Sequence, residues 1–342
     1  MIISHQFIFI LILQLLVLPG IYNLMQIFAR LNFAWLDLEK KRNQIQFVHF
    51  KSLVLKLTPE QKIHYTLRIA SVMCFIGHGA FGIITKEIWT NYFAVFGVSR
   101  DISFQLMPYL GTIDILFGLI ILFYPIRAVV LWLVAWGVVT ALLRPLSGEP
   151  FAEFLERAGN FGAPLALLFL SGSPLVNIKT LFKPLTADVQ LNADTLQKVT
   201  SCLRFVVFLL LLGHGGLNLI EKKSLVNQYT ALGFSNGAAT AQLVGLLEIV
   251  FAFAILIRPF RPVVLIFFIW KAGSELFYPH YEVFEWIERG GSYGALLALW
   301  FALDFLPSFK INVASSFRNT FLLHRVPANS ERLFSNDDDY TK

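Results

Sequence analysis

The sequence predicts an all-α fold, a polytopic bundle of membrane helices. Hydrophobic residues make up 56% of the chain and charged residues only 15%, whereas a soluble domain usually carries about 25% charged residues. Apolar runs of about 20 residues, the length that crosses a bilayer, recur along the chain. No alternating pattern indicates a barrel, so the need to satisfy every backbone group in lipid favours helices.

Eight apolar spans are expected, and they fall into two parallel units of four helices. The units cover 66–176 and 201–306 and repeat the same motifs, which is typical of tandem duplication. Because four spans is an even number, both copies enter the membrane from the same side, and their pseudo-two-fold axis follows the membrane normal. The expected spans are 67–86, 104–124, 126–143, 159–176, 203–221, 239–257, 261–278 and 292–306.

Three further segments flank the units. Residues 1–65 form an N-terminal segment, 177–200 a linker, and 307–342 a cytoplasmic tail that is partly disordered. A ninth apolar stretch, 7–28, is interpreted as an extra membrane helix, with an upstream mis-start of translation as the alternative. Lys and Arg are concentrated in the linker, the tail and the connections on the same side, which places that side in the cytoplasm. The formal charge of +6 therefore reflects topology, and no nucleic-acid partner is expected.

A histidine lies near the middle of the first span of each unit, and a carboxylate lies at a similar depth in the second. His78 is about ten residues, or about 15 Å, into its span, half of a hydrocarbon core about 30 Å thick. Neighbouring antiparallel helices would bring His78 to Asp114 and His214 to Glu248. The functional hypothesis is that these are catalytic pairs that move a proton or orient a ligand. The alternative is a polar clasp that only fixes helix packing.

Before the fourth span, each unit repeats Glu-x-x-Glu-Arg-x-Gly-x-x-Gly. A Glu and an Arg four residues apart on a helix share a face and can form an ion pair. The functional hypothesis is an outer rim that binds an anionic or polar head group. The alternative is a clasp at the helix start, since ion pairs at a membrane surface are common and weak. The candidate ligand-binding residues are Glu153, Glu156 and Arg157 in unit one, Glu285, Glu288 and Arg289 in unit two, and Arg144 at the outer end of the third span.

The motifs argue against a haem and against a metal site. If the faces of His78 and His214 met at the axis, they would supply both axial ligands of a haem. This alternative is disfavoured, because each helix has one such histidine and no second haem motif accompanies it. No metal site is predicted: His-Glu-x-x-His is missing from the sequence, and Cys74 and Cys202 form no Cys-x-x-Cys.

Three motifs together resemble the DoxX-like family of four-helix membrane proteins, here as a tandem fusion. They are the Gly-rich first span with a central polar residue, Gly111-x-x-Asp114 in the second span, and Glu153-x-x-Glu156-Arg157-x-Gly159 before the fourth. The resemblance covers 66–306. It implies a bacterial inner-membrane protein associated with quinone-linked sulfur or redox chemistry, and a quinone as the candidate cofactor. The fusion and the N-terminal segment depart from the family's single unit.

The leading functional prediction is therefore a DoxX-like integral membrane protein that handles a quinone or a similar small lipophilic molecule through its His–carboxylate pairs. One alternative is a transporter or carrier with its substrate between the two units near the midplane. Another is a non-catalytic scaffold for a complex with other membrane proteins. In each case the lipid bilayer is the expected partner.

Overall fold

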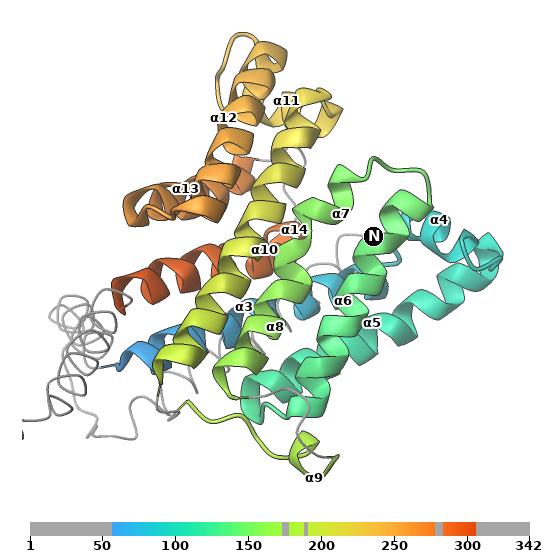
Figure 1. The fold of residues 1–342 in the computed structure, drawn as a ribbon. Helices are drawn as coiled ribbons and strands as arrows, with labels where there is room; N and C mark the ends of the chain where they lie inside the picture. Colours follow the sequence, from blue (N-terminus) through green and yellow to red (C-terminus); the bar gives the residue numbers. More distant parts are fainter. Residues whose placement is uncertain (1–56, 173–177, 188–190, 278–282, 306–342) are drawn as a thin grey trace, which may run out of the picture.

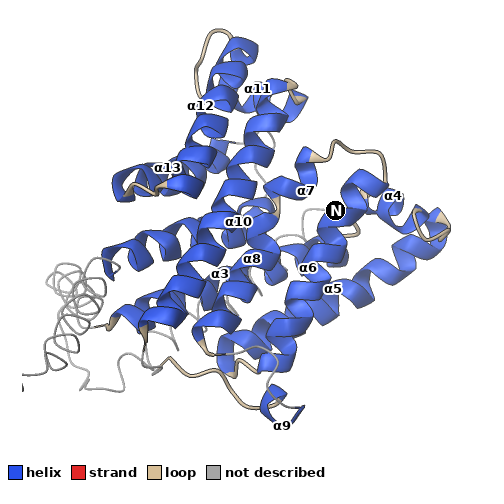
Figure 2. Ribbon diagram, viewed as in Figure 1, coloured by secondary structure: helices blue, strands red, loops and turns tan. Residues whose placement is uncertain are grey.

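The computed structural model describes residues 57–172, 178–187, 191–277 and 283–305, and these are mostly helical with no β-strand among them (Figures 1 and 2). The predicted helix at 7–28 and the predicted tail lie outside the described residues. The helices are α3 (Pro59–Ile83), α4 (Trp89–Ala94), α5 (Arg100–Phe123), α6 (Arg127–Leu146), α7 (Ala152–Glu156), α8 (Ala158–Leu170), α9 (Ile178–Leu181), α10 (Ala193–Leu219), α11 (Lys223–Ala231), α12 (Gly237–Ile257), α13 (Arg261–Ser274), the 3-10 helix η1 (Glu275–Phe277), α14 (Val283–Glu288) and a helix over 290–305.

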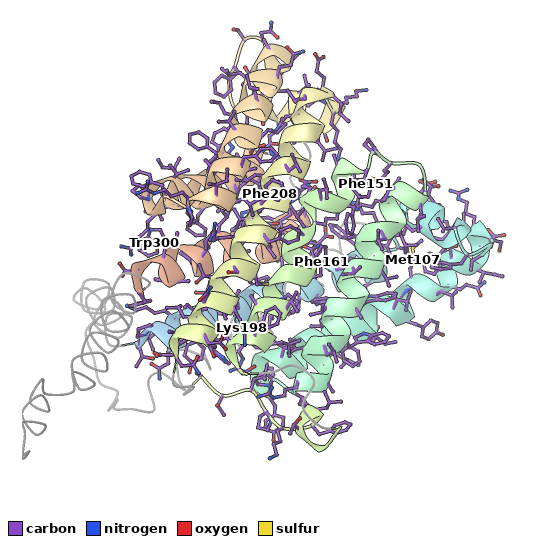
Figure 3. All side chains as sticks on the ribbon, viewed as in Figure 1. Met107, Phe151, Phe161, Lys198, Phe208 and Trp300 are labelled. Carbon is purple, nitrogen blue, oxygen red and sulfur yellow. The ribbon has the colours of Figure 1, made fainter. Side chains whose placement is uncertain are left out.

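Among the described residues, five helices are long and apolar enough to cross a membrane, namely α3, α5, α6, α10 and α12. The prediction of a helical membrane protein is confirmed to this extent. Helices α8 and α13 have 13 and 14 residues, so eight crossings stay a prediction. Large apolar side chains project outwards from the bundle (Figure 3), and Tyr109, Leu243 and Ile266 are 71%, 60% and 63% exposed. Such an apolar exterior suits lipid rather than water.

The first helix of each predicted unit begins earlier than its apolar run. Helix α3 begins at Pro59 because Thr58 and Gln61 form a capping box, in which each side chain bonds the other residue's backbone N–H. Helix α10 begins at Ala193, and the Asn192 side chain accepts a hydrogen bond from the backbone N–H of Thr195. Polar first turns therefore extend both helices into segments that the sequence assigned to the N-terminal region and the linker.

Helices α3 and α10 form the centre of the bundle. Helix α3 packs against α5, α8 and α14, and α10 packs against α12, α8 and α7. In Figure 1, α5 and α6 lie together on one side of this centre, and α12 and α13 lie together on the other. The outer helices expose most of their apolar surface, whereas α3 and α10 are the most buried of the five long helices.

Close backbone contacts join the two halves of the chain. A Cβ on Gly77 of α3 would lie 2.3 Å from the backbone nitrogen of Glu288 in α14. A Cβ on Gly213 of α10 would lie 2.2 Å from the backbone nitrogen of Glu156 in α7. The absent side chains thus let each short helix press against the long helix of the other half. These contacts carry the glutamates of α7 and α14 to the histidine-bearing helices.

Candidate functional site

The first histidine is paired with a buried carboxylate, as the sequence predicts. The Nδ1 atom of His78 in α3 lies 2.7 Å from Oδ2 of Asp114 in α5, and Asp114 is 2% exposed. Trp136 of α6 donates a weak hydrogen bond from Nε1 to the same oxygen, at 3.4 Å. Gly79 and Gly111 allow this approach, since a Cβ on Gly79 would lie 2.6 Å from the Gly111 carbonyl oxygen. The carboxylate holds the Nδ1–H of the imidazole and leaves Nε2 for another partner.

A cavity opens beside His78. Its empty volume, which includes space open to the surroundings, is about 690 Å³. The Trp89 ring lies over the imidazole with ring centroids 4.6 Å apart. Most of the wall is apolar, and a histidine and three charged side chains also line it. The lining residues include Trp89, Tyr92, Phe93, Phe96, Leu110, Trp136 and Leu143 on the apolar side, and His78, Arg144, Arg157, Asn160 and Glu288 on the polar side.

The second histidine has a similar partner but a more enclosed setting. His214 Nδ1 of α10 lies 2.5 Å from Glu248 Oε2 of α12, and both residues are almost fully buried. Asn218 donates to the same Glu248 oxygen at 3.2 Å, and its own carbonyl oxygen accepts a bond from Tyr229 Oη at 2.9 Å. In the second half, side chains therefore bond Nδ1 of His214 and Oε2 of Glu248, whereas Nε2 of His214 and Oε1 of Glu248 are buried without a hydrogen-bond partner among the described residues.

The other side of His214 faces two carboxylates. One candidate ligand atom from each of His214, Glu156 and Glu275 lies within 4.8 Å of the others, and all three residues are buried. By donor type this trio could hold a metal ion. Its carboxylates, however, already accept bonds from cations, with Arg289 Nη1 at 2.7 Å from Glu156 and Lys271 Nζ at 3.1 Å from Glu275. The arrangement is therefore better described as a buried ion-pair network than as a metal centre.

This network crosses between the two halves. Arg157 Nη1 lies 2.6 Å from Glu153 and 3.2 Å from Glu156. Arg289 Nη1 lies 2.7 Å from Glu156 and 3.2 Å from Glu275. Glu156 is thus shared by an arginine of its own half and one of the other half. Burial alone would raise the pKa of Glu156, but the positive charges of Arg289 and Arg157 hold that pKa well below its ordinary value.

The remaining rim residues form pairs further out. Lys86 Nζ lies 2.6 Å from Glu285, and Arg144 Nη1 lies 3.1 Å from Glu149. Lys222 pairs with Glu153. Burial would raise the pKa of Glu285, yet Arg289 and Lys86 lower it below its ordinary value. The rim is therefore a set of mutually neutralising charges rather than a free cationic surface.

The structure gathers the predicted site residues into two groups, one around each histidine. His78, Arg144, Arg157 and Glu288 line one cavity, whereas His214 meets Glu156 across the halves. Sequence analysis missed Asn218, Tyr229, Lys271 and Glu275. Lys271 and Glu275 were detectable, because two charged residues four apart inside an expected apolar span are a functional signal. They do not recur in both predicted units, because Gly137 and Ala141 occupy the positions of the first predicted unit that would match them.

The fold and the site define a class of protein, a helical membrane protein with buried His–carboxylate pairs. No protein-family model, curated protein or solved structure matches the chain. The resemblance to the DoxX-like family accordingly stays a prediction that rests on the motifs quoted above.

Proposed function

We propose that the protein is an integral membrane protein built from two copies of one four-helix unit, 66–176 and 201–306. Matching backbone conformations support the duplication. Thr85 and Glu221 occupy equivalent positions, and both adopt the left-handed conformation, with φ of 53° and 54°. Gly97 and Gly233 are also equivalent, with φ of 72° and 94°. Positive φ is rare for residues such as Thr and Glu, so its recurrence at matching positions favours a common origin.

Equivalent arginines also bind equivalent backbone groups. Arg68 donates to the carbonyl oxygens of Ile121 and Leu122 at the end of α5, at 2.8 and 2.6 Å. Arg204 donates to the corresponding carbonyl oxygens at the end of α12, those of Ile255 and Leu256. In both units the arginine of the first helix thus satisfies the last turn of the second helix. Under this proposal α8, α13 and the 290–305 helix complete the eight spans.

We infer further that the cavity beside His78 binds a small lipophilic molecule with a polar head group. The observation that carries this proposal is the combination of an aromatic wall with a His–Asp pair whose imidazole Nε2 makes no hydrogen bond to the described residues. A neutral Nε2 accepts a proton or hydrogen bond from the head group, and a protonated one donates it. A quinone is the first candidate, from the DoxX-like resemblance. The second histidine, enclosed by Asn218 and the ion pairs, plays a structural part.

The same proposal places the protein in a bacterial inner membrane with the linker 177–200 and the tail 307–342 in the cytoplasm. One contact supports the shared side of the linker and the first inner turn. The backbone N–H of Leu185 donates to the carbonyl oxygen of Pro125 at 2.7 Å, and Ile126 forms an isolated antiparallel bridge with Pro184. The described end of the linker therefore lies against the turn that the positive-inside rule places in the cytoplasm.

The experiment compares three proteins purified in native-lipid discs. Small molecules are extracted and identified by mass spectrometry, and UV–visible spectra are recorded before extraction. Leu110→Trp fills the cavity, whereas Leu116→Trp adds the same bulk to the same helix at a residue that is 52% exposed. We expect a stoichiometric lipophile in the parent and in Leu116→Trp, and its loss from Leu110→Trp. Ordinary phospholipid alone in all three samples would overturn the proposal and favour a scaffold.

A further inference from the structure

The two halves carry different residues beside their histidines. In the second half, α13 carries Lys271, the 3-10 helix η1 begins at Glu275, and both side chains are buried. Under the proposed duplication, the matching positions of α6 in the first half are Gly137 and Ala141. The first half therefore lacks a carboxylate where the second half supplies one from its own chain.

The Glu275 carboxylate shows how the second half uses this position. Its Oε1 atom lies 3.2 Å from Arg289 Nη1 and 3.1 Å from Lys271 Nζ. The same residue lies beside His214 and Glu156, within the 4.8 Å group described above. A carboxylate is thus held by an arginine and a second cation next to the histidine.

The first half has the matching receptors around an open cavity. His78 corresponds to His214, Arg157 to Arg289, and Glu288 of the second half to Glu156 of the first, and His78, Arg157 and Glu288 all line the cavity. Arg144 also lines it, and its contacts with Glu149 and Glu153 both come from Nη1, so its other donors can serve as a second cationic group for the ligand. The hydrogen bonds of Arg157 to Glu153 and Glu156 all come from Nη1. A guanidinium has five N–H donors, so Nη2 and Nε keep donors for a ligand.

We propose that the cavity beside His78 takes a small carboxylic acid with an apolar body, whose carboxylate sits where Glu275 sits in the second half. This inference rests on the proposed function and its duplication, and it names an acidic head group in place of the neutral head group of a quinone. Arg157 and Arg144 bind the carboxylate through charge-assisted hydrogen bonds, and the apolar body lies along Trp89, Phe93 and Leu110. The nearby negative charge of Glu288 is no obstacle, because Glu156 and Glu275 already lie side by side around Arg289.

The test uses two probes of the same shape and opposite head-group charge. Binding of 4-phenylbutyrate and of neutral 4-phenylbutanamide to the parent protein in lipid discs is measured by titration calorimetry at pH 7, with protein-free discs subtracted. We expect the acid to bind at least about tenfold more tightly than the amide. Equal or tighter binding of the amide, or no binding of either probe, would overturn the acidic assignment. The extraction experiment judges the proposed function separately, because a neutral lipophile lost only from Leu110→Trp would still support it.

One variant places a carboxylate in the first half at the position that matches Glu275 of the second half. Ala141→Glu supplies the missing carboxylate, and we expect it to weaken binding of the acid by about tenfold or more. Ala141→Gln adds the same bulk without the charge and should weaken binding less, so an equal loss in both would count against a carboxylate site. If Ala141→Glu does not fold, Arg144→Gln replaces it, and the preference for the acid over the amide should then shrink. A preference unchanged in Arg144→Gln would overturn the role of this cation.

Discussion

Arg289 reaches across the molecule to Glu156, with Nη1 2.7 Å from Oε1, and both side chains lie inside the bundle. The arginine belongs to the second half of the chain and the glutamate to the first. The same glutamate also accepts from Arg157 of its own half. One carboxylate is therefore shared by two arginines, one from each half, and it links the halves through an ion pair.

Replacing Glu156 should destabilise the protein strongly. Glu156→Ala leaves Arg289 and Arg157 short of a partner in a buried setting, and breaking a buried pair costs about 3–5 kcal/mol. Thermal unfolding in lipid discs measures the change. Lys198→Ala is the control, because Lys198 pairs with Asp194 at 2.6 Å but both side chains are more than half exposed and such pairs contribute about 0–1 kcal/mol. Similar losses in the two variants would contradict a structural role for the crossed pair.

The same carboxyl gives a pH dependence with a defined sign. The pKa of Glu156 is held well below its ordinary value of 4.5, so the unfolded chain binds a proton at Glu156 at a higher pH than the folded protein does. The contribution of the Glu156 carboxylate to the free energy of unfolding is thus fully present above about pH 4.5, and it is lost as the pH falls through the lowered pKa. Unfolding temperatures between pH 7 and pH 3 should fall less steeply for Glu156→Gln than for the parent protein. A parallel decline would show that Glu156 contributes nothing to the acid sensitivity.

The sequence predicts the helical class and the two His–carboxylate contacts for a clear physical reason. Charged residues in apolar runs must find partners, and the antiparallel order of neighbouring spans restricts which partners are near. His78 and Asp114, as well as His214 and Glu248, lie together for this reason. The role of these pairs stays a prediction.

The contacts between the two halves of the chain could not be predicted from the sequence in the same way. The sequence suggested that Glu153 would pair with Arg157, four residues later on one helix, and this pair is present. Arg289, by contrast, bonds Glu156, which is 133 positions away in the chain. Periodicity describes one helix at a time, whereas this contact depends on how α7 and α14 pack against the opposite half. The polar helix starts at Thr58 and Asn192 were missed because the spans were measured from their apolar runs.

The two histidines should respond differently to replacement. His78→Ala should release the cavity's ligand, and because it also removes the main partner of Asp114, which is 2% exposed, it should cost about 1–3 kcal/mol. His214→Ala removes the main partner of Glu248, which is 1% exposed, and should cost about 1–3 kcal/mol while the ligand stays bound. Ligand content and unfolding temperature are measured on the same preparations. Loss of the ligand from both variants would indicate two working sites rather than one.

Glycines at the crossing points give the sharpest structural test. In Gly77→Ala the new Cβ would meet the Glu288 backbone nitrogen at 2.3 Å, and in Gly213→Ala it would meet the Glu156 nitrogen at 2.2 Å. Backbone cannot move aside as a flexible side chain can, so each change should cost about 1–3 kcal/mol or more. Gly273→Ala in α13 is the matched control, because its Cβ would meet nothing within 4 Å and alanine is the better helix former by about 1 kcal/mol.

The relation among these three variants tests the packing of the halves. If α7 lies on α10 and α14 lies on α3, Gly77→Ala and Gly213→Ala should each lower the unfolding temperature, and Gly273→Ala should leave it unchanged or raise it. Glycine-to-alanine changes on an open helix surface would all act as Gly273→Ala does, since they would differ only in helix propensity. A rise in stability in all three variants would therefore mean that the short helices do not press against the histidine-bearing helices.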